Sequence, residues 1–204
     1  MGINERKERD KQEMRSNIIK AAMAMFLTEG YEKTSIRNIA ERIEYSPATI
    51  YLYYKDKDEL LYDVQKHAFT QLEKEFATYA TATDPLERLE QICHTYVKFG
   101  KENHELYALM FIVKAPMNCV DEKELWTNGD NSFNLLVGCL KECIDQKLIR
   151  FNDVMIAALS VWAMGHGLIS LDIGCRFKVM QMDQDQINQA ILAAINEYLR
   201  LIKS

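Results

Sequence analysis

The sequence has little glycine and proline, with only 8 Gly and 3 Pro among its 204 residues. Because these two residues interrupt helices most strongly, their scarcity favours long, unbroken helices. No stretch shows the sustained alternation of apolar and polar residues that is typical of a half-buried strand. Apolar residues make up 48% of the chain and charged residues 27%, an ordinary globular balance. The sequence therefore predicts an all-α protein of one or two domains.

A regular set of cysteines is also missing. The five cysteines are odd in number and follow no framework spacing, which argues against a disulfide-stabilised secreted protein. The stretch from Met1 to Arg15 is charged throughout and lacks the apolar core of a secretory signal. We therefore expect a cytoplasmic protein with reduced thiols. Cys139 and Cys143 lie four residues apart on one helix face, where simple packing is favoured and a redox or metal pair is the alternative.

Long apolar runs are scarce, with one exception between Val154 and Leu171, where 18 residues contain no charge. That length is the lower limit for a membrane-spanning helix. Gly, Ser and His interrupt the run, Asp153 and Asp172 flank it, and neither end carries a basic anchor. A helix buried in a helical interface therefore explains the run better than a membrane span does.

The sequence shows no excess of positive charge. The net charge is −5, which by itself argues against a nucleic-acid-binding protein. Residues 1–66 are neutral overall, and the rest of the chain carries the whole −5. Between Lys33 and Lys57 five basic residues stand against three acidic ones, a small excess that a dimer would double. Evidence for DNA binding must therefore come from a motif.

Capping residues mark the helix boundaries clearly. Ser46-Pro47, Asp84-Pro85 and Asp183 each combine an N-cap residue with a following proline or a capping-box partner. Apolar residues recur at helical spacing between these signals. Together they predict nine helices, at residues 10–29, 36–43, 47–54, 57–79, 85–100, 102–113, 121–146, 153–174 and 184–201.

The nine helices are predicted to form two domains. Residues 1–66, with three short helices and the start of the fourth, form a small head. Residues 67–204 form a helical bundle, and the long fourth helix connects the two parts. The expected fold is all-α, with nine helices in two domains.

The segment between Thr34 and Tyr54 has the pattern of a helix-turn-helix, whose second helix enters the major groove of DNA. Groove fit requires small residues at the leading end of that helix, and phosphate contacts require hydroxyls, amides and lysine around its edges. We therefore predict DNA contacts from nine residues, namely Thr34, Ser35, Ser46, Pro47, Ala48, Thr49, Tyr51, Tyr53 and Lys57.

The string from Ala22 to Leu60 resembles the TetR family of transcriptional regulators. It reads A-x-x-x-F-x-x-x-G-Y-x-x-T-S-x-x-x-I-A, followed by S-P-A-T-I-Y-x-Y-Y-K-D-K-D-E-L. The many fixed spacings make this motif far more specific than a short pattern. The resemblance implies that Tyr51 contacts phosphate and that Tyr54 is a buried aromatic residue.

Three positions depart from the family pattern. Glu44 stands where the turn between the two helices usually has glycine, and a left-handed conformation there costs a non-glycine residue about 1 kcal/mol. Tyr45 stands where valine is common, so we expect the local core to hold a larger side chain. Ala48 replaces a frequent glycine, and its methyl group limits how closely the backbone approaches DNA.

TetR-like proteins use the second domain to bind a small molecule and to dimerise through the last two helices. The resemblance places the dimer interface at residues 153–174 and 184–202, which explains the charge-free run. The element W-x-x-x-H-G at residues 162–167 resembles one C-terminal subfamily. The implied pocket, rich in Met and aromatic residues, suits an apolar or aromatic effector. Its candidate ligand-binding residues, each with plain core packing as the alternative, are Tyr96, Phe99, Tyr107, Met110, Phe111, Trp126, Phe133, Trp162 and His166.

The resemblance implies a repressor that binds a palindromic double-stranded DNA operator as a homodimer and is released by a small effector. A ligand near the fourth helix would change the spacing of the two recognition helices. An effector-independent DNA-binding factor of the same family is the alternative. A helical-bundle enzyme comes third, because the sequence has no Glu-x-x-His, nucleotide-loop or His-Glu-x-x-His motif. We therefore expect no enzymatic activity, no cofactor, no metal site and no membrane partner.

Overall fold

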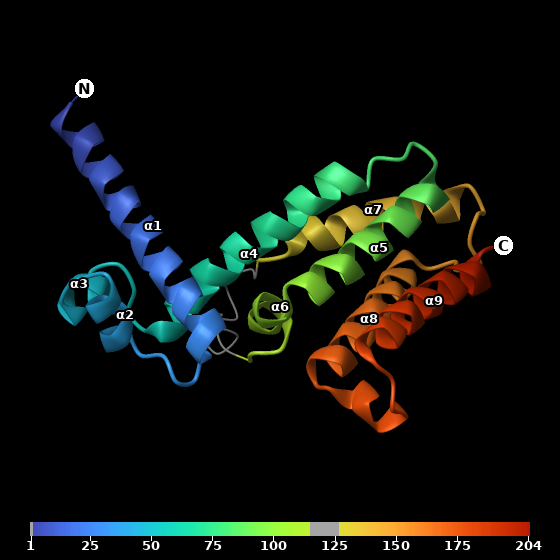
Figure 1. Cartoon of the computed structure of the whole chain (residues 1–204). Helices are drawn as coiled ribbons and strands as arrows, with labels where there is room; N and C mark the ends of the chain where they lie inside the picture. Colours follow the sequence, from blue (N-terminus) through green and yellow to red (C-terminus); the bar gives the residue numbers. More distant parts are fainter. Residues whose placement is uncertain (1, 115–126) are drawn as a thin grey trace. The chain divides into compact units, whose positions relative to one another are not determined.

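The computed structural model describes residues 2–114 and 127–204 of the chain (Figure 1). Within these residues it contains nine α-helices, one short 3₁₀ helix and no β-strand, so the all-α prediction is confirmed. The helices are α1 (Ile3–Glu29), α2 (Ile36–Arg42), α3 (Pro47–Tyr51), α4 (Lys57–Tyr79), α5 (Pro85–Glu102), α6 (His104–Phe111), α7 (Asp130–Asp145), α8 (Val154–Ile173), η2 (Arg176–Met180) and α9 (Gln184–Ile202).

Short-range capping decides where several helices begin. At the start of α3 the Ser46 hydroxyl accepts a hydrogen bond from the Thr49 backbone N–H at 3.3 Å. At the start of α8 the Asp153 carboxylate accepts from the backbone N–H groups of Met155 and Ile156, at 2.8 and 2.9 Å. These bonds satisfy N–H groups that have no partner inside the helix. Each capping side chain bonds to an N–H group only two or three residues further along the chain. The sequence therefore predicted the starts of α3 and α8 correctly.

Other boundaries differ from the sequence prediction. Helix α1 begins at Ile3 rather than at residue 10, since the charged stretch before residue 10 consists mainly of strong helix formers. Helix α3 ends at Tyr51, and the 3₁₀ helix η2 was not predicted. The predicted helix 121–146 is also wrong in part, because residues 127–129 are not helical and α7 begins at Asp130. Residues 121–126 lie outside the described residues.

Glycine is required at the bend before α7. Gly129 has a φ of +87°, a backbone conformation that residues with a side chain rarely adopt. A Cβ atom at this position would also lie 2.8 Å from the ring of Phe69. The bend therefore stops a helix that sequence periodicity alone would continue.

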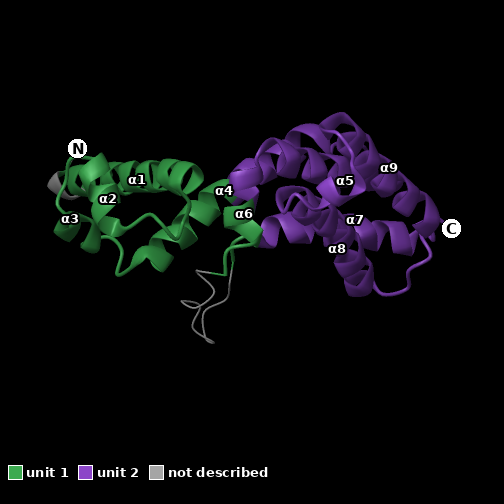
Figure 2. Ribbon diagram, turned by 60° about the horizontal axis from the view of Figure 1, so that its bottom comes forward, with its two compact units in different colours: residues 1–68, 108–128 green, residues 69–107, 129–204 purple. Residues whose placement is uncertain are grey.

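The chain forms two compact units, shown in different colours in Figure 2. Unit 1 comprises residues 1–68 and 108–128, and unit 2 comprises residues 69–107 and 129–204. Both the long helix α4 and the short helix α6 are divided between the units. Unit 1 therefore includes residues from two widely separated parts of the chain.

Unit 1 is built around one apolar cluster. Ile18 and Phe26 of α1, Ile39 of α2, Ile50 of α3 and Leu60 of α4 are all buried in it. The spacing of these residues follows the helical period, so each short helix turns one apolar face inward. Leu109 of α6 belongs to the same cluster.

Unit 2 packs α5, α7, α8 and α9 against one another. Helices α5 and α8 approach closely at Gly100, where an added Cβ would lie 2.8 Å from Ile169. The thiols of Cys93, Cys139 and Cys143 are buried among these helices, and the Cys139 thiol donates to the Pro85 carbonyl at 3.3 Å. In the part of the chain that the structure describes, no group of three or more His, Cys, Asp or Glu side chains could hold a metal ion.

Helix α8 contains the charge-free run and is only partly covered. By length and composition alone it could cross a membrane, with a mean hydropathy of 1.8, but such a helix also occurs in soluble proteins. Only 28% of its most apolar window is buried within the chain. The exposed side chains of α8 include Met155, Ile156, Leu159 and Trp162. Contiguous exposed apolar residues of this kind mark interaction surfaces in proteins.

Candidate nucleic-acid interface

The turn between α2 and α3 is held by a Schellman motif. The Glu44 N–H donates to the Glu41 carbonyl at 3.2 Å, and the Tyr45 N–H donates to the Ala40 carbonyl at 2.9 Å. Glu44 has a φ of +61°, the left-handed conformation for which glycine is preferred. The turn therefore keeps the usual geometry, and Glu44 bears the conformational cost that the sequence suggested.

Tyr45 corrects one expectation about this turn. The sequence led us to expect a local core enlarged to hold its side chain, but 48% of Tyr45 is exposed. The reason is its position directly after the left-handed residue, where the chain leaves α2. A large aromatic side chain therefore lies on the surface at the entrance to α3.

Helix α3 presents a small polar surface. Ser46 and Ala48 are exposed, Thr49 is half-buried, and the Ser46 and Thr49 hydroxyls lie 3.1 Å apart. Tyr51 is 55% exposed, whereas Ile50 is fully buried in the unit 1 core. Among the predicted contact residues, Ser35, Pro47 and Tyr53 are also exposed or half-buried. The helix is thus anchored by one apolar side chain and leaves hydroxyl groups on its outer side.

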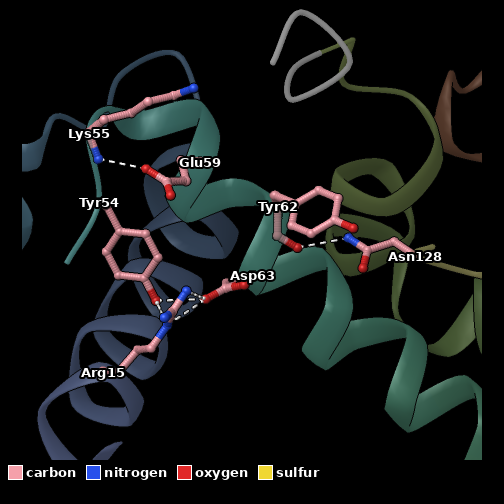
Figure 3. Close-up of polar contacts among 7 residues, drawn as sticks. All are labelled: Arg15, Tyr54, Lys55, Glu59, Tyr62, Asp63 and Asn128. Carbon is pink, nitrogen blue, oxygen red and sulfur yellow. Dashed lines mark hydrogen bonds and ion pairs between the residues drawn. The ribbon is translucent and has the colours of Figure 1, made fainter. Parts of the chain in front are cut away.

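A buried tyrosine connects the helix-turn-helix to its neighbours (Figure 3). Tyr54 is 1% exposed, as the resemblance implied, and its hydroxyl donates to the Asp63 carboxylate at 2.9 Å. The Arg15 guanidinium donates to the Tyr54 hydroxyl at 3.2 Å and to Asp63 at 2.9 Å. Burial, followed by the charge of Asp63, raises the pKa of Tyr54, so the phenol stays protonated. This polar triad links α1, the end of the helix-turn-helix and α4.

Two predicted DNA-contact residues have internal partners instead. The Lys57 ammonium donates to the backbone carbonyls of Tyr31 and Thr34, at 2.9 and 3.0 Å, and lies 4.0 Å from the centre of the Tyr31 ring. The Thr34 side chain is buried, and its hydroxyl donates to the Gly30 carbonyl at 2.9 Å. The Tyr31 hydroxyl donates to Asp58. These contacts fix the loop between α1 and α2 against the first turn of α4.

The structure also exposes residues that the sequence analysis did not select. Leu52, directly after α3, is 81% exposed, and Lys55 follows on the same loop. The Lys55 backbone N–H donates to Glu59 at 2.6 Å, and the Lys55 side chain points away from Glu59 (Figure 3). Lys55 is exposed. In a sequence, a leucine at helical spacing is usually interpreted as a core residue. The structure shows instead that α3 ends at Tyr51 and that Leu52 faces solvent.

Family models match both parts of the chain. A model described as bacterial regulatory proteins of the tetR family matches residues 18–64, which contain the helix-turn-helix. A second model, described as a tetracyclin repressor-like C-terminal domain, matches residues 89–195, about half of the chain. The chain belongs to the TetR family of transcriptional regulators. It is therefore a DNA-binding regulator of the helix-turn-helix type, as the sequence predicted.

Individual relatives agree with the family models. The chain is 37% identical over 165 residues to the HTH-type transcriptional regulator HbdR of Aromatoleum sp. (strain CIB), a match that covers 76% of this chain and 71% of HbdR. It is 24% identical over 167 residues to AcrR of Shigella flexneri, covering 78% and 77% of the two chains. A TetR family transcription regulator from Marinobacter aquaeolei VT8 has the same fold, with a TM-score of 0.69 at 21% identity and coverage of 97% and 99%.

The second unit of this TetR-family protein contains a hydrogen-bonded row of aromatic and polar side chains. The hydroxyls of Tyr96 and Tyr107 lie 2.7 Å apart, and the Tyr107 hydroxyl lies 2.8 Å from Nδ1 of His166. The other ring nitrogen of His166 lies 3.3 Å from the Ser170 hydroxyl. The Trp162 indole N–H donates to the Tyr96 hydroxyl at 3.1 Å. Four of the predicted ligand-binding residues thus form one group.

Burial keeps this group neutral. It lowers the pKa of His166 and raises that of Tyr96 to about 12. A neutral imidazole can accept a hydrogen bond on one nitrogen and donate on the other, and each neighbouring hydroxyl can act in either role.

The remaining predicted ligand-binding residues are distributed differently. The Phe133 ring packs edge-to-face against Trp162, with ring centres 5.9 Å apart. Phe99 is buried on α5. Met110 and Phe111 belong to unit 1, and Trp126 lies outside the described residues.

Proposed function

We propose that this TetR-family regulator is a cytoplasmic repressor that binds a palindromic operator as a homodimer and is released by a small apolar or aromatic effector. The observation that carries the DNA-binding part is the outer side of α3. The hydroxyl groups of Ser46 and Thr49 lie 3.1 Å apart and Tyr51 is exposed, on a helix anchored by the buried side chain of Ile50.

These hydroxyl groups suit contacts to DNA phosphates and base edges. A short helix with small residues at its leading end fits the major groove, and Thr49 can reach a thymine methyl or a base edge. Ser35, Pro47, Ala48 and Tyr53 complete the proposed contact surface. For Thr34 and Lys57 we propose a supporting role through the backbone of the α1–α2 loop, because their polar atoms are already bonded within unit 1.

The proposed homodimer forms through α8 and α9. Met155, Ile156 and Leu159 of α8 are each about half exposed or more, and Leu192 of α9 is 42% exposed. Side chains of this kind form the apolar centre of stable protein interfaces. A two-fold symmetric dimer places its two recognition helices about one DNA turn apart. Its operator should therefore have the same symmetry, which means a palindromic sequence.

The proposed effector site is the group formed by Tyr96, Tyr107, Trp162 and His166, with Phe133 beside it. Its aromatic faces suit an apolar ligand, and its hydroxyl and imidazole groups can exchange their mutual hydrogen bonds for bonds to a polar end of the ligand. An effector acts only through its different affinity for the DNA-competent and incompetent states. The same mutual hydrogen bonds also favour the alternative, a DNA-binding factor without an effector, because the group needs no ligand to satisfy it.

Selection of bound DNA from a random pool tests the proposal directly. We expect a palindromic sequence, and we expect Thr49→Ala and Tyr51→Phe to weaken its binding. Tyr79→Phe is the matched control, because Tyr79 is exposed to the same extent on the distal part of α4. Repeating the measurement with aromatic and aliphatic compounds tests release. A non-palindromic product, or unchanged binding by both α3 variants, would contradict the assignment of the interface.

A further inference from the structure

Unit 2 contains a second polar region that the proposed function does not use. It is a cleft of about 450 Å³ between the end of α5, the first residue of α6, the end of α8 and the start of α9. Its walls include His104, Asp172, Lys101, Gln184 and Asn188. None of these residues belongs to the aromatic group around Tyr107.

The inner wall of the cleft holds a buried carboxylate with unsatisfied hydrogen-bonding capacity. Asp172 is 8% exposed, and its Oδ2 atom accepts no hydrogen bond from any described residue. The Nε2 atom of His104 lies 3.3 Å away, within ion-pair distance if the imidazole is protonated, but the two atoms do not meet the geometry of a hydrogen bond, and Nε2 has no other hydrogen-bond partner among the described residues. Buried polar atoms are almost always paired in proteins, because leaving one unpaired costs its full desolvation. A ligand that donates hydrogen bonds would satisfy Asp172.

The rim of the same cleft carries two lysines. Lys98 and Lys101 both line it from α5, and the Lys98 ammonium lies 4.7 Å from the centre of the Tyr79 ring. His104 is the first residue of α6 and Gln184 the first of α9, so two helix N-termini with partial positive charge border the cleft, as do the C-terminal ends of α5 and α8, whose partial charge is negative. Glu102 also lines the cleft and is exposed. A ligand suited to both regions carries a cationic donor and an anionic group.

We propose that this cleft binds a free α-amino acid. The ammonium group bonds to the Asp172 carboxylate, and the carboxylate pairs with Lys101. The Gln184 amide donates to the Asn188 side-chain carbonyl at 3.5 Å, and the other polar atoms of these two amides can bond to the ligand. The cleft volume lies within the range of small-molecule sites. Binding here is a second ligand function, separate from the proposed effector site and from DNA contact.

Calorimetric titration of the full chain with the twenty proteinogenic amino acids, without DNA, tests this proposal. We expect at least one to bind and to raise the unfolding temperature, because a ligand bound only to the folded state stabilises it. For each amino acid that binds, the methyl ester removes the carboxylate charge and the N-acetyl derivative removes the ammonium charge. Each derivative should bind at least about tenfold more weakly, which corresponds to one lost charged contact.

Variants assign the binding to this cleft. Asp172→Asn and Lys101→Met should each lower the affinity at least about tenfold, whereas Glu105→Gln and Lys141→Met, which change exposed charges outside the cleft, should not. If Asp172→Asn does not fold, Lys101→Met and the two derivatives still decide the matter. The proposal is overturned if no amino acid binds at about 10 mM, where even weak sites fill. It is equally overturned if an N-acetyl derivative or methyl ester binds as well as its parent, or if the variants bind like the unchanged protein. Because DNA is absent, these results are independent of the operator and effector tests.

Discussion

The two units of this regulator use polar side chains in opposite ways. In unit 1 the polar groups of Arg15, Tyr54 and Asp63 connect separate helices, and the apolar residues are largely inside. In unit 2 polar groups gather inside, around Tyr107 and at Asp172, while apolar side chains of α8 face outward. The difference fits the proposal that unit 1 reads DNA while unit 2 binds a second copy of the chain and small ligands.

The largest effect should come from a charge placed on the exposed face of α8. Leu159→Asp would bury an unpaired carboxylate in the proposed dimer interface, at an expected cost of about 3 kcal/mol in association. Analytical ultracentrifugation measures the shift from dimer to monomer. Lys141→Asp on the outer face of α7 is a control that should leave the dimer intact. A dimer unchanged by Leu159→Asp would place the interface elsewhere.

The next largest effect should come from breaking the polar triad of the head. Asp63→Ala removes the acceptor of both Arg15 and Tyr54, so we expect unit 1 to lose about 2 kcal/mol of stability. Because Arg15 is partly exposed and can bind water instead, the loss should be smaller than for a fully buried pair. Hydrogen exchange of the α1, α2 and α3 amides measures it, with Asp10→Ala as the exposed control. Equal exchange in the variant and the parent would show that the apolar cluster alone fixes the head.

A smaller effect is expected for a single DNA contact. Tyr51→Phe keeps the ring but removes the hydroxyl, and a hydrogen bond to a charged phosphate is worth about 1.5 kcal/mol. We therefore expect operator affinity to fall roughly tenfold per half-site. Fluorescence anisotropy with labelled operator DNA measures the change. Phosphate contact also predicts equal weakening for unrelated DNA, whereas a loss confined to the operator would indicate a base contact.

A stabilising change should be possible at the helix-turn-helix itself. Glu44→Gly relieves the left-handed conformation and should raise the stability of unit 1 by about 1 kcal/mol. It also removes a negative charge next to the proposed interface, so DNA affinity should rise at low salt. Thermal unfolding and salt-dependent binding separate the two effects. Glu41→Gln, one turn earlier in α2, removes a charge and its exposed ion pair with Arg37 without changing the backbone, so it should raise the affinity with little change in stability.

The smallest effect should be a pH dependence of unit 2. Burial lowers the pKa of His166 in the folded state, so the unfolded chain binds more protons at acidic pH. The contribution of neutral His166 to the stability of the folded state is therefore complete above about pH 6.5. It is lost as the pH falls through the pKa that His166 has in the folded state. Unfolding followed between pH 8 and 5 (roughly spanning the ordinary histidine pKa) should show less acid sensitivity for His166→Gln than for the parent. His67→Gln, an exposed position, should retain the dependence of the parent.

The sequence by itself determined the features that depend on neighbours along the chain. The caps at Ser46, Asp153 and Asp183 need only a side-chain oxygen and an N–H within three residues, so the starts of α3, α8 and α9 followed directly. The left-handed conformation of Glu44 could likewise be anticipated from the spacing of the motif. Family membership rested on the same fixed spacings.

Tertiary structure decided the features that depend on residues distant in sequence. Thr34 and Lys57 were predicted to contact DNA, but contacts between α4 and the α1–α2 loop occupy their polar atoms. Tyr45 was expected inside and lies on the surface. The buried carboxylate of Asp172 accepts no hydrogen bond on Oδ2 and lies beside His104, which stands 68 positions earlier in the chain, and only the packing of α6 against α8 shows this. Hydrogen-bond partners and burial depend on packing between helices, and no local pattern encodes that packing.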